Sequence, residues 1–172
     1  MNVNARACLA GALLMASAGC VSRLFVPEAH DSVREARERE RDTCPPGDKP
    51  EYPASLFDSR FIIRVEGLYS TVQSGRSGEA SHLWGATLYV KVTAGGSAEL
   101  LEALLNCHNA RSELDRPGEP VLEEDPYWLR GRTLDISVRH DSNVYRVDVK
   151  AKDLPTAQEI LRRARAFRGL RG

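Results

Sequence analysis

Apolar side chains recur at every second position in four segments of the chain. They are, in chain order, Phe61, Ile63 and Val65; Leu88, Val90 and Val92; Leu134, Ile136 and Val138; and Tyr145, Val147 and Val149. Such alternation is typical of a strand with one buried face. We therefore expect strands at about 61–66, 84–93, 134–139 and 145–149, the last two joined by a short turn near 141–143.

Two other segments carry apolar residues at helical spacing. The first follows Gly95-Gly96-Ser97, ends before Pro117 and has Leu100, Leu101, Leu104, Leu105 and Cys107 on one face. The second begins after Asp153, a good N-cap, ends at Gly169 and carries Ala157, Ile160, Leu161, Ala164 and Phe167. The predicted order is strand, strand, helix, strand, strand, helix.

This order predicts an α+β fold. Consecutive hairpins favour a four-stranded antiparallel sheet in a two-layer sandwich, with both helices on one face and the other face wet. We place this domain at 58–172.

A charge-rich segment precedes the domain. Alternating Arg and Glu run from Arg34 to Asp42, and Glu35 precedes Arg39 by four residues, which favours a helix. Its apolar stripe is thin, so we predict a solvated, partly helical tether; a partner-binding helix is the alternative.

The first twenty residues predict export. Arg6 precedes an uncharged, mostly apolar run from Ala7 to Ala16, which is too short for a membrane-spanning helix and typical of a signal peptide. Ala16-Ser17-Ala18 is one possible cleavage site, of the ordinary secretory kind.

Ser17-Ala18-Gly19-Cys20 resembles the lipobox of bacterial lipoproteins, in which small residues precede a cysteine that becomes the lipidated first residue. The resemblance implies a signal peptide at 1–19, a lipidated N-terminus and tether at 20–57, and a membrane anchor through lipid on Cys20. By the sorting rule of well-studied bacteria, Val21 after the cysteine implies the outer membrane, with the protein facing the periplasm.

Cysteine parity favours the same reading. Cys8 leaves with the signal, and if Cys20 is lipidated only Cys44 and Cys107 remain. In an oxidising compartment we expect these two to form a disulfide. The alternative is that Cys107 is simply a small buried apolar residue.

Composition and motifs limit the possible chemistry. Lys plus Arg equals Asp plus Glu at 24 each, so the whole chain has no electrostatic footprint for nucleic acid. Its four histidines are scattered, with no spacing typical of zinc ligands, and no catalytic motif is present. We predict no metal, no cofactor and no enzymatic activity.

The irregular stretch 115–131 is the candidate partner-binding loop. It carries Glu123, Glu124, Asp125, Tyr127 and Trp128, which combine acidic groups with aromatic types common at binding hot spots. Alternatively, the aromatics fold back and cap an edge of the core. The sequence thus predicts a lipid-anchored envelope protein, a non-catalytic binding or structural module whose partner is an envelope protein or polysaccharide. A carrier or sensor of a small ligand, bound between helices and sheet, is the alternative.

Overall fold

The computed structural model describes residues 29–44, 58–73, 79–92, 96–115 and 124–169. The elements are α1 (Ala29–Thr43), the 3-10 turn η1 (Ser59–Phe61), β1 (Ile62–Gln73), β2 (Glu79–Lys91), α3 (Ala98–Glu113), β3 (Asp135–Asp141), β4 (Val144–Lys150) and α4 (Leu154–Gly169). From β1 onward, the predicted order of strands and helices is confirmed.

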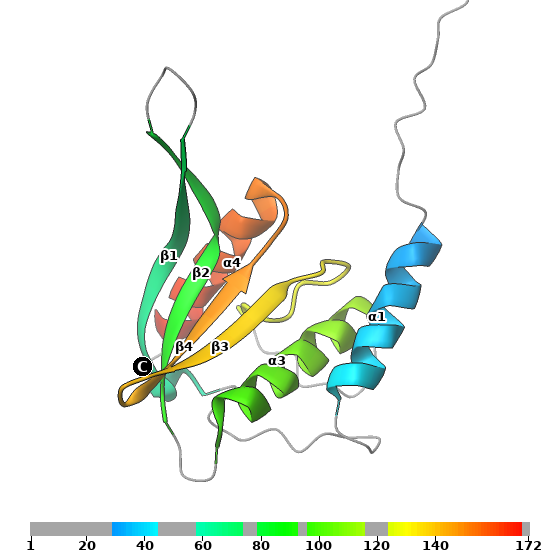
Figure 1. Ribbon diagram of the computed structural model, residues 1–172, viewed down its shortest axis with the longest axis horizontal. Helices are drawn as coiled ribbons and strands as arrows, with labels where there is room; N and C mark the ends of the chain where they lie inside the picture. Colours follow the sequence, from blue (N-terminus) through cyan, green and yellow to red (C-terminus); the bar gives the residue numbers. More distant parts are fainter. Residues whose placement is uncertain (1–28, 45–57, 74–78, 93–95, 116–123, 170–172) are drawn as a thin grey trace, which may run out of the picture.

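The four strands form one antiparallel sheet in the order β1-β2-β4-β3. Helix α4 packs against β1 and β2, and α3 packs against β3 (Figure 1). Both helices share one buried cluster with the sheet, so they cover the same face of it. The predicted α+β sandwich is therefore confirmed.

The core lies between the sheet and these helices. One rung of the sheet places Val65, Leu88, Val147 and Val138 side by side on the inner face. Leu105 of α3 and Ile160 of α4, both fully buried, belong to the same cluster. Burying such a side chain contributes roughly 1.5–3 kcal/mol. The packing of the sheet against α3 and α4 is therefore the main source of stability.

The start of β1 departs from the predicted alternation. The register slips between Ile62 and Arg64, so Ile62 is buried and Ile63 is 40% exposed. A bulge of this kind adds one residue to a strand and reverses the faces that precede it. The prediction that Ile63 points inward is therefore wrong, whereas Val65 does pack against the core.

Helix α3 also protects an edge of the sheet. The Asn106 side-chain nitrogen donates to the Ile136 carbonyl at 3.0 Å, and the Val138 amide donates to Glu102 Oε2 at 2.7 Å. These are the backbone groups that an edge strand leaves unpaired, and that would otherwise recruit another strand. Two backbone groups of the β3 edge are thus satisfied from within the chain.

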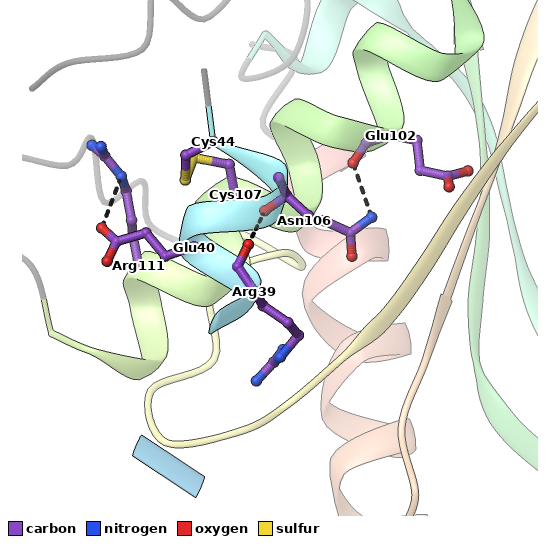
Figure 2. The surroundings of a disulfide bond; sticks show 8 residues. Arg39, Glu40, Cys44, Glu102, Asn106, Cys107 and Arg111 are labelled. Carbon is purple, nitrogen blue, oxygen red and sulfur yellow. Dashed lines mark hydrogen bonds and ion pairs between the residues drawn. A yellow bond between two sulfur atoms is a disulfide. The ribbon is translucent and has the colours of Figure 1, made fainter. Parts of the chain in front are cut away.

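The charged N-terminal segment is a helix, as predicted, but one of its faces lies against α3 rather than in solvent. A disulfide joins Cys44, just beyond α1, to Cys107 in the middle of α3 (Figure 2). Ala36 is 1% exposed, and Arg39 Nη2 lies 2.6 Å from Glu113 Oε2. Helix α1 is therefore docked on the domain, on the side of α3 away from the sheet (Figure 1).

Several predictions concern the chain outside the described residues. The signal peptide, the lipobox with Cys20, and Glu123 all lie there. Within the described ranges, no helix has the length and apolar character needed to cross a membrane.

Replacing the disulfide tests how α1 is held. In Cys44→Ser/Cys107→Ser we expect the free energy of unfolding to fall by about 2–4 kcal/mol, because the bridge closes a loop with a sequence separation of 63. Urea denaturation of the purified protein measures this loss. Equal stability of the variant and of the oxidised protein would contradict the account.

Candidate binding surface

A row of arginines crosses the open face of the sheet. Arg64 of β1, Tyr89 of β2, Arg146 of β4 and Arg139 of β3 occupy neighbouring positions in one rung. Paired residues share a face, and this rung alternates with the inward rung of Leu88 and Val147. The side chains of Arg139 and Arg64 are 65% and 54% exposed. The face opposite the helices therefore presents cations from three of its four strands.

Asp148, in the next rung, holds two of these arginines. Its carboxylate accepts from Thr87 Oγ1 at 2.7 Å, from Arg146 Nε at 3.0 Å and from Arg139 Nη2 at 2.8 Å. Although it lies on the open face, Asp148 is 1% exposed. A carboxylate removed from water needs such donors, so the arginines lie over Asp148.

The electrostatics of Asp148 follow from this environment. Burial acts to raise the pKa of Asp148, but the hydrogen bonds from Thr87, Arg139 and Arg146 outweigh it and hold the pKa below its ordinary value. The same carboxylate raises the pKa of Arg146. Both groups are therefore charged at neutral pH.

Arg64 is fixed by different contacts at the other end of the row. Its guanidinium carbon lies 3.9 Å from the centre of the Tyr89 ring, and its Nε lies 3.2 Å from Glu66 Oε1. The Tyr89 hydroxyl donates to the same Glu66 side chain at 3.2 Å. Stacking on an aromatic face leaves the edge of a guanidinium able to donate, so Arg64 remains available to a partner.

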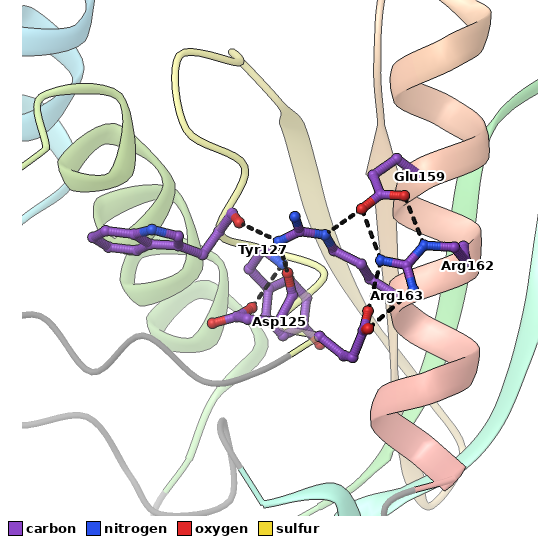
Figure 3. Close-up of polar contacts among 7 residues, drawn as sticks. Asp125, Tyr127, Glu159, Arg162 and Arg163 are labelled. Carbon is purple, nitrogen blue, oxygen red and sulfur yellow. Dashed lines mark hydrogen bonds and ion pairs between the residues drawn. The ribbon is translucent and has the colours of Figure 1, made fainter.

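The described part of the predicted partner-binding loop, from residue 124, is packed against the domain. Tyr127 and Trp128 are 2% and 3% exposed, and Asp125 is 1% exposed. Glu124 lies 2.7 Å from Arg162 of α4, and the Arg163 side chain donates to the Trp128 carbonyl at 2.9 Å (Figure 3). Asp125, Tyr127 and Trp128 are too buried to form a protein-binding surface. The aromatics fold back against the core, which was the alternative prediction.

Burial also affects Tyr127. Removal of its hydroxyl from water, with a smaller effect from the charge of Asp125, raises the pKa of Tyr127 well above its ordinary value. It is therefore a neutral member of the core.

His108 and Asp125 form a buried pair that the sequence did not predict. His108 Nε2 lies 2.9 Å from Asp125 Oδ2, and the other carboxylate oxygen accepts from the Tyr127 amide at 2.8 Å. The Trp128 ring packs on His108 with a centroid separation of 4.8 Å. A histidine beside a carboxylate is part of many catalytic sites, but both side chains are buried and Cys107 is oxidised. The pair fastens the loop to α3.

Asn109, the next residue of α3, pins the loop further along. Its side-chain nitrogen lies 3.3 Å from the Tyr127 carbonyl and 3.3 Å from the Arg132 carbonyl, and its oxygen accepts from the Leu134 amide at 3.1 Å. The sequence did hold a signal for this residue. Asn109 follows Leu101 and Leu105 at intervals of four residues, so it lies on the apolar face of the helix, where a polar side chain needs partners.

The described residues include no group of three or more His, Cys, Asp or Glu side chains placed to hold a metal ion. Comparisons with protein-family models, with curated proteins and with solved structures find no match for this chain.

Replacing Asp148 tests the arginine row. In Asp148→Asn we expect a loss of about 1–2 kcal/mol in the free energy of unfolding at pH 7, because two guanidinium groups lose their charged acceptor. The folded-state pKa is depressed, so the contribution is present above about pH 4 and is lost as pH falls through the folded pKa. Denaturant unfolding should show the difference from wild type shrinking in acid.

Asp135→Asn is the matched control, because the Asp135 side chain is 72% exposed and lies 3.6 Å from Lys150. It should change stability by less than about 0.5 kcal/mol. Equal losses for the two variants would show that Asp148 does not organise the face.

Replacing Asn109 tests the attachment of the loop. Asn109→Ala leaves the Leu134 amide and two carbonyls without their partner, and should cost about 2–4 kcal/mol. Asn106→Ala, which removes bonds at a part-buried site, should cost less. Chemical denaturation measures the free energy of unfolding of both variants. A smaller loss for Asn109→Ala than for Asn106→Ala would exclude the role of Asn109 in holding the loop.

Proposed function

We propose that this chain is an exported, lipid-anchored cell-envelope protein whose domain faces the periplasm and binds an acidic segment of another envelope protein on its open sheet face. It acts as a binding module without catalytic activity. The observation that carries the proposal is the arginine row of Arg64, Arg146 and Arg139.

Export is supported by the N-terminal signal pattern and by the disulfide. Structural disulfides form and persist in oxidising compartments, of which the bacterial periplasm is one. The Cys44–Cys107 bridge therefore accords with the destination that the signal and the lipobox imply.

The docking of α1 bears on where the domain would work. If lipid is attached at Cys20, only the residues up to Ala29 separate the anchor from the first docked helix. Nine residue steps span at most about 30 Å. The domain would thus be held near the membrane, rather than at the end of the tether of 38 residues, 20–57, that the sequence predicted.

The partner's chemistry follows from charge complementarity. Arg139 places one nitrogen, Nη2, on Asp148, so most of its five N–H groups remain for an incoming acceptor. Guanidinium groups bind carboxylates in a bidentate manner. The neighbouring rung holds two acids. Asp148 is buried beneath Arg139 and Arg146, whereas Glu66 is 46% exposed and paired with Arg64. Arg139, 65% exposed, is therefore the most accessible cation of the row. An extended acidic peptide suits the row, which runs across the strands.

The binding test uses a fluorescent peptide of about twenty glutamates and the purified mature chain. Arg139→Glu should weaken binding at least tenfold at low salt, because it removes one cation and adds a repulsive charge. Arg165→Glu, on an exposed position of α4, makes the same charge change and should have little effect. Added salt should weaken binding to the wild type through screening.

The anchor is tested separately. Cys20→Ala should move the protein from the membrane fraction to the soluble periplasmic fraction while its purified form still binds the peptide. If Cys20→Ala stays in the membrane fraction, lipidation of Cys20 is refuted and the binding surface is not. If Arg139→Glu binds the peptide as wild type does, the binding surface is refuted and lipidation is not.

A further inference from the structure

A second, separate site lies between the loop after Trp128 and helix α4. A cavity of about 380 Å³ is lined there by Trp128, Leu129, Arg130, Arg132 and Arg163. Its volume lies within the range of small-molecule sites, roughly 300–1,000 Å³. It is not the pocket between helices and sheet that the sequence suggested, and it is distinct from the open face.

The wall of this cavity is basic. Among the described residues that line it, three of five are arginines and none is acidic. The acids that approach Arg130 and Arg132 lie outside the lining: Asp115 at 3.5 Å and Asp153 at 3.9 Å. All four side chains are at least 45% exposed, and ion pairs of this kind contribute little. An incoming anion can therefore displace them.

Arg163 supplies the fixed part of the site. Its Nε donates to Glu159 Oε1 at 2.7 Å, and its Nη1 donates to the Trp128 carbonyl at 2.9 Å and to the Asp125 carbonyl at 3.4 Å (Figure 3). Within the described part of the chain, nothing accepts from Nη2. A guanidinium held on three acceptors, with two N–H donors to spare, is preorganised for a ligand.

We propose that this cavity binds the phosphate group of a small phosphate monoester. A monoester has three terminal oxygens and up to two negative charges, which suits three guanidinium groups better than a carboxylate does. Leu129 and Trp128 give the wall an apolar part, which suits the organic portion of an ester. The monoester is either a soluble molecule or the headgroup of a lipid such as phosphatidic acid, since both present the same group.

The experiment titrates the mature chain with phenyl phosphate by calorimetry. We expect one site with a Kd of about 1 mM or tighter. Arg130→Gln/Arg132→Gln should weaken binding at least tenfold, because each exposed arginine donates a charged hydrogen bond. Both positions are exposed, so the variant should retain the wild-type circular dichroism spectrum. Arg165→Gln is the matched control and should bind as wild type does.

Vesicles distinguish the sources of the phosphate. Flotation with phosphatidic acid vesicles that exceeds flotation with phosphatidylglycerol vesicles, a diester control, supports the lipid headgroup; binding of phenyl phosphate without such a preference supports a soluble monoester. Absence of both kinds of binding overturns the proposal. So does binding that the double variant leaves unchanged, or benzoate binding as tightly as phenyl phosphate.

Discussion

A buried carboxylate sets the character of the open face. Asp148 lies on the side of the sheet away from the helices and yet is 1% exposed. It is held there by Thr87, Arg139 and Arg146. Because a charge without donors is costly to remove from water, this carboxylate requires the arginines to lie across it. The face is thereby a fixed polar surface, neither a second hydrophobic layer nor a set of freely moving side chains.

Helix α3 joins the less regular parts of the molecule to the sheet. It bonds one carbonyl of the β3 edge through Asn106, carries the disulfide to α1 through Cys107, and fastens residues 125–127 through His108 and Asn109. Each contact uses a polar or sulfur-containing group on a helix that buries Leu101, Leu104 and Leu105 in the core and leaves Leu100 exposed, contrary to the prediction. The charged helix and the described residues of the loop thus belong to the domain, and the cavity beside Arg163 is lined by residues that follow this segment.

The strands and helices of the domain could be predicted because their apolar periods are clear. The disulfide followed from counting cysteines after the signal. What failed was what periodicity does not encode: Ile63 faces outward because of a bulge, and Trp128 is buried although it lies in an irregular segment.

The arginine row was also beyond sequence reasoning. Arg64 and Arg139 are far apart in the chain, and they share a rung only because β4 lies between β2 and β3. Strand order depends on which connections pack best over the helices, and alternation within single strands carries no information on it. Asp148 likewise reads as an ordinary outward residue until both arginines are placed beside it.

Site-specific photocrosslinking in intact cells tests the central claim most directly. A photoreactive residue at Ser137, which shares a rung of the open face with Asp148, should capture one envelope protein, in a segment rich in Asp and Glu. The same residue at Arg165, on α4, should not. Capture from Arg165 with none from Ser137 would contradict the assignment of the open face as the binding surface.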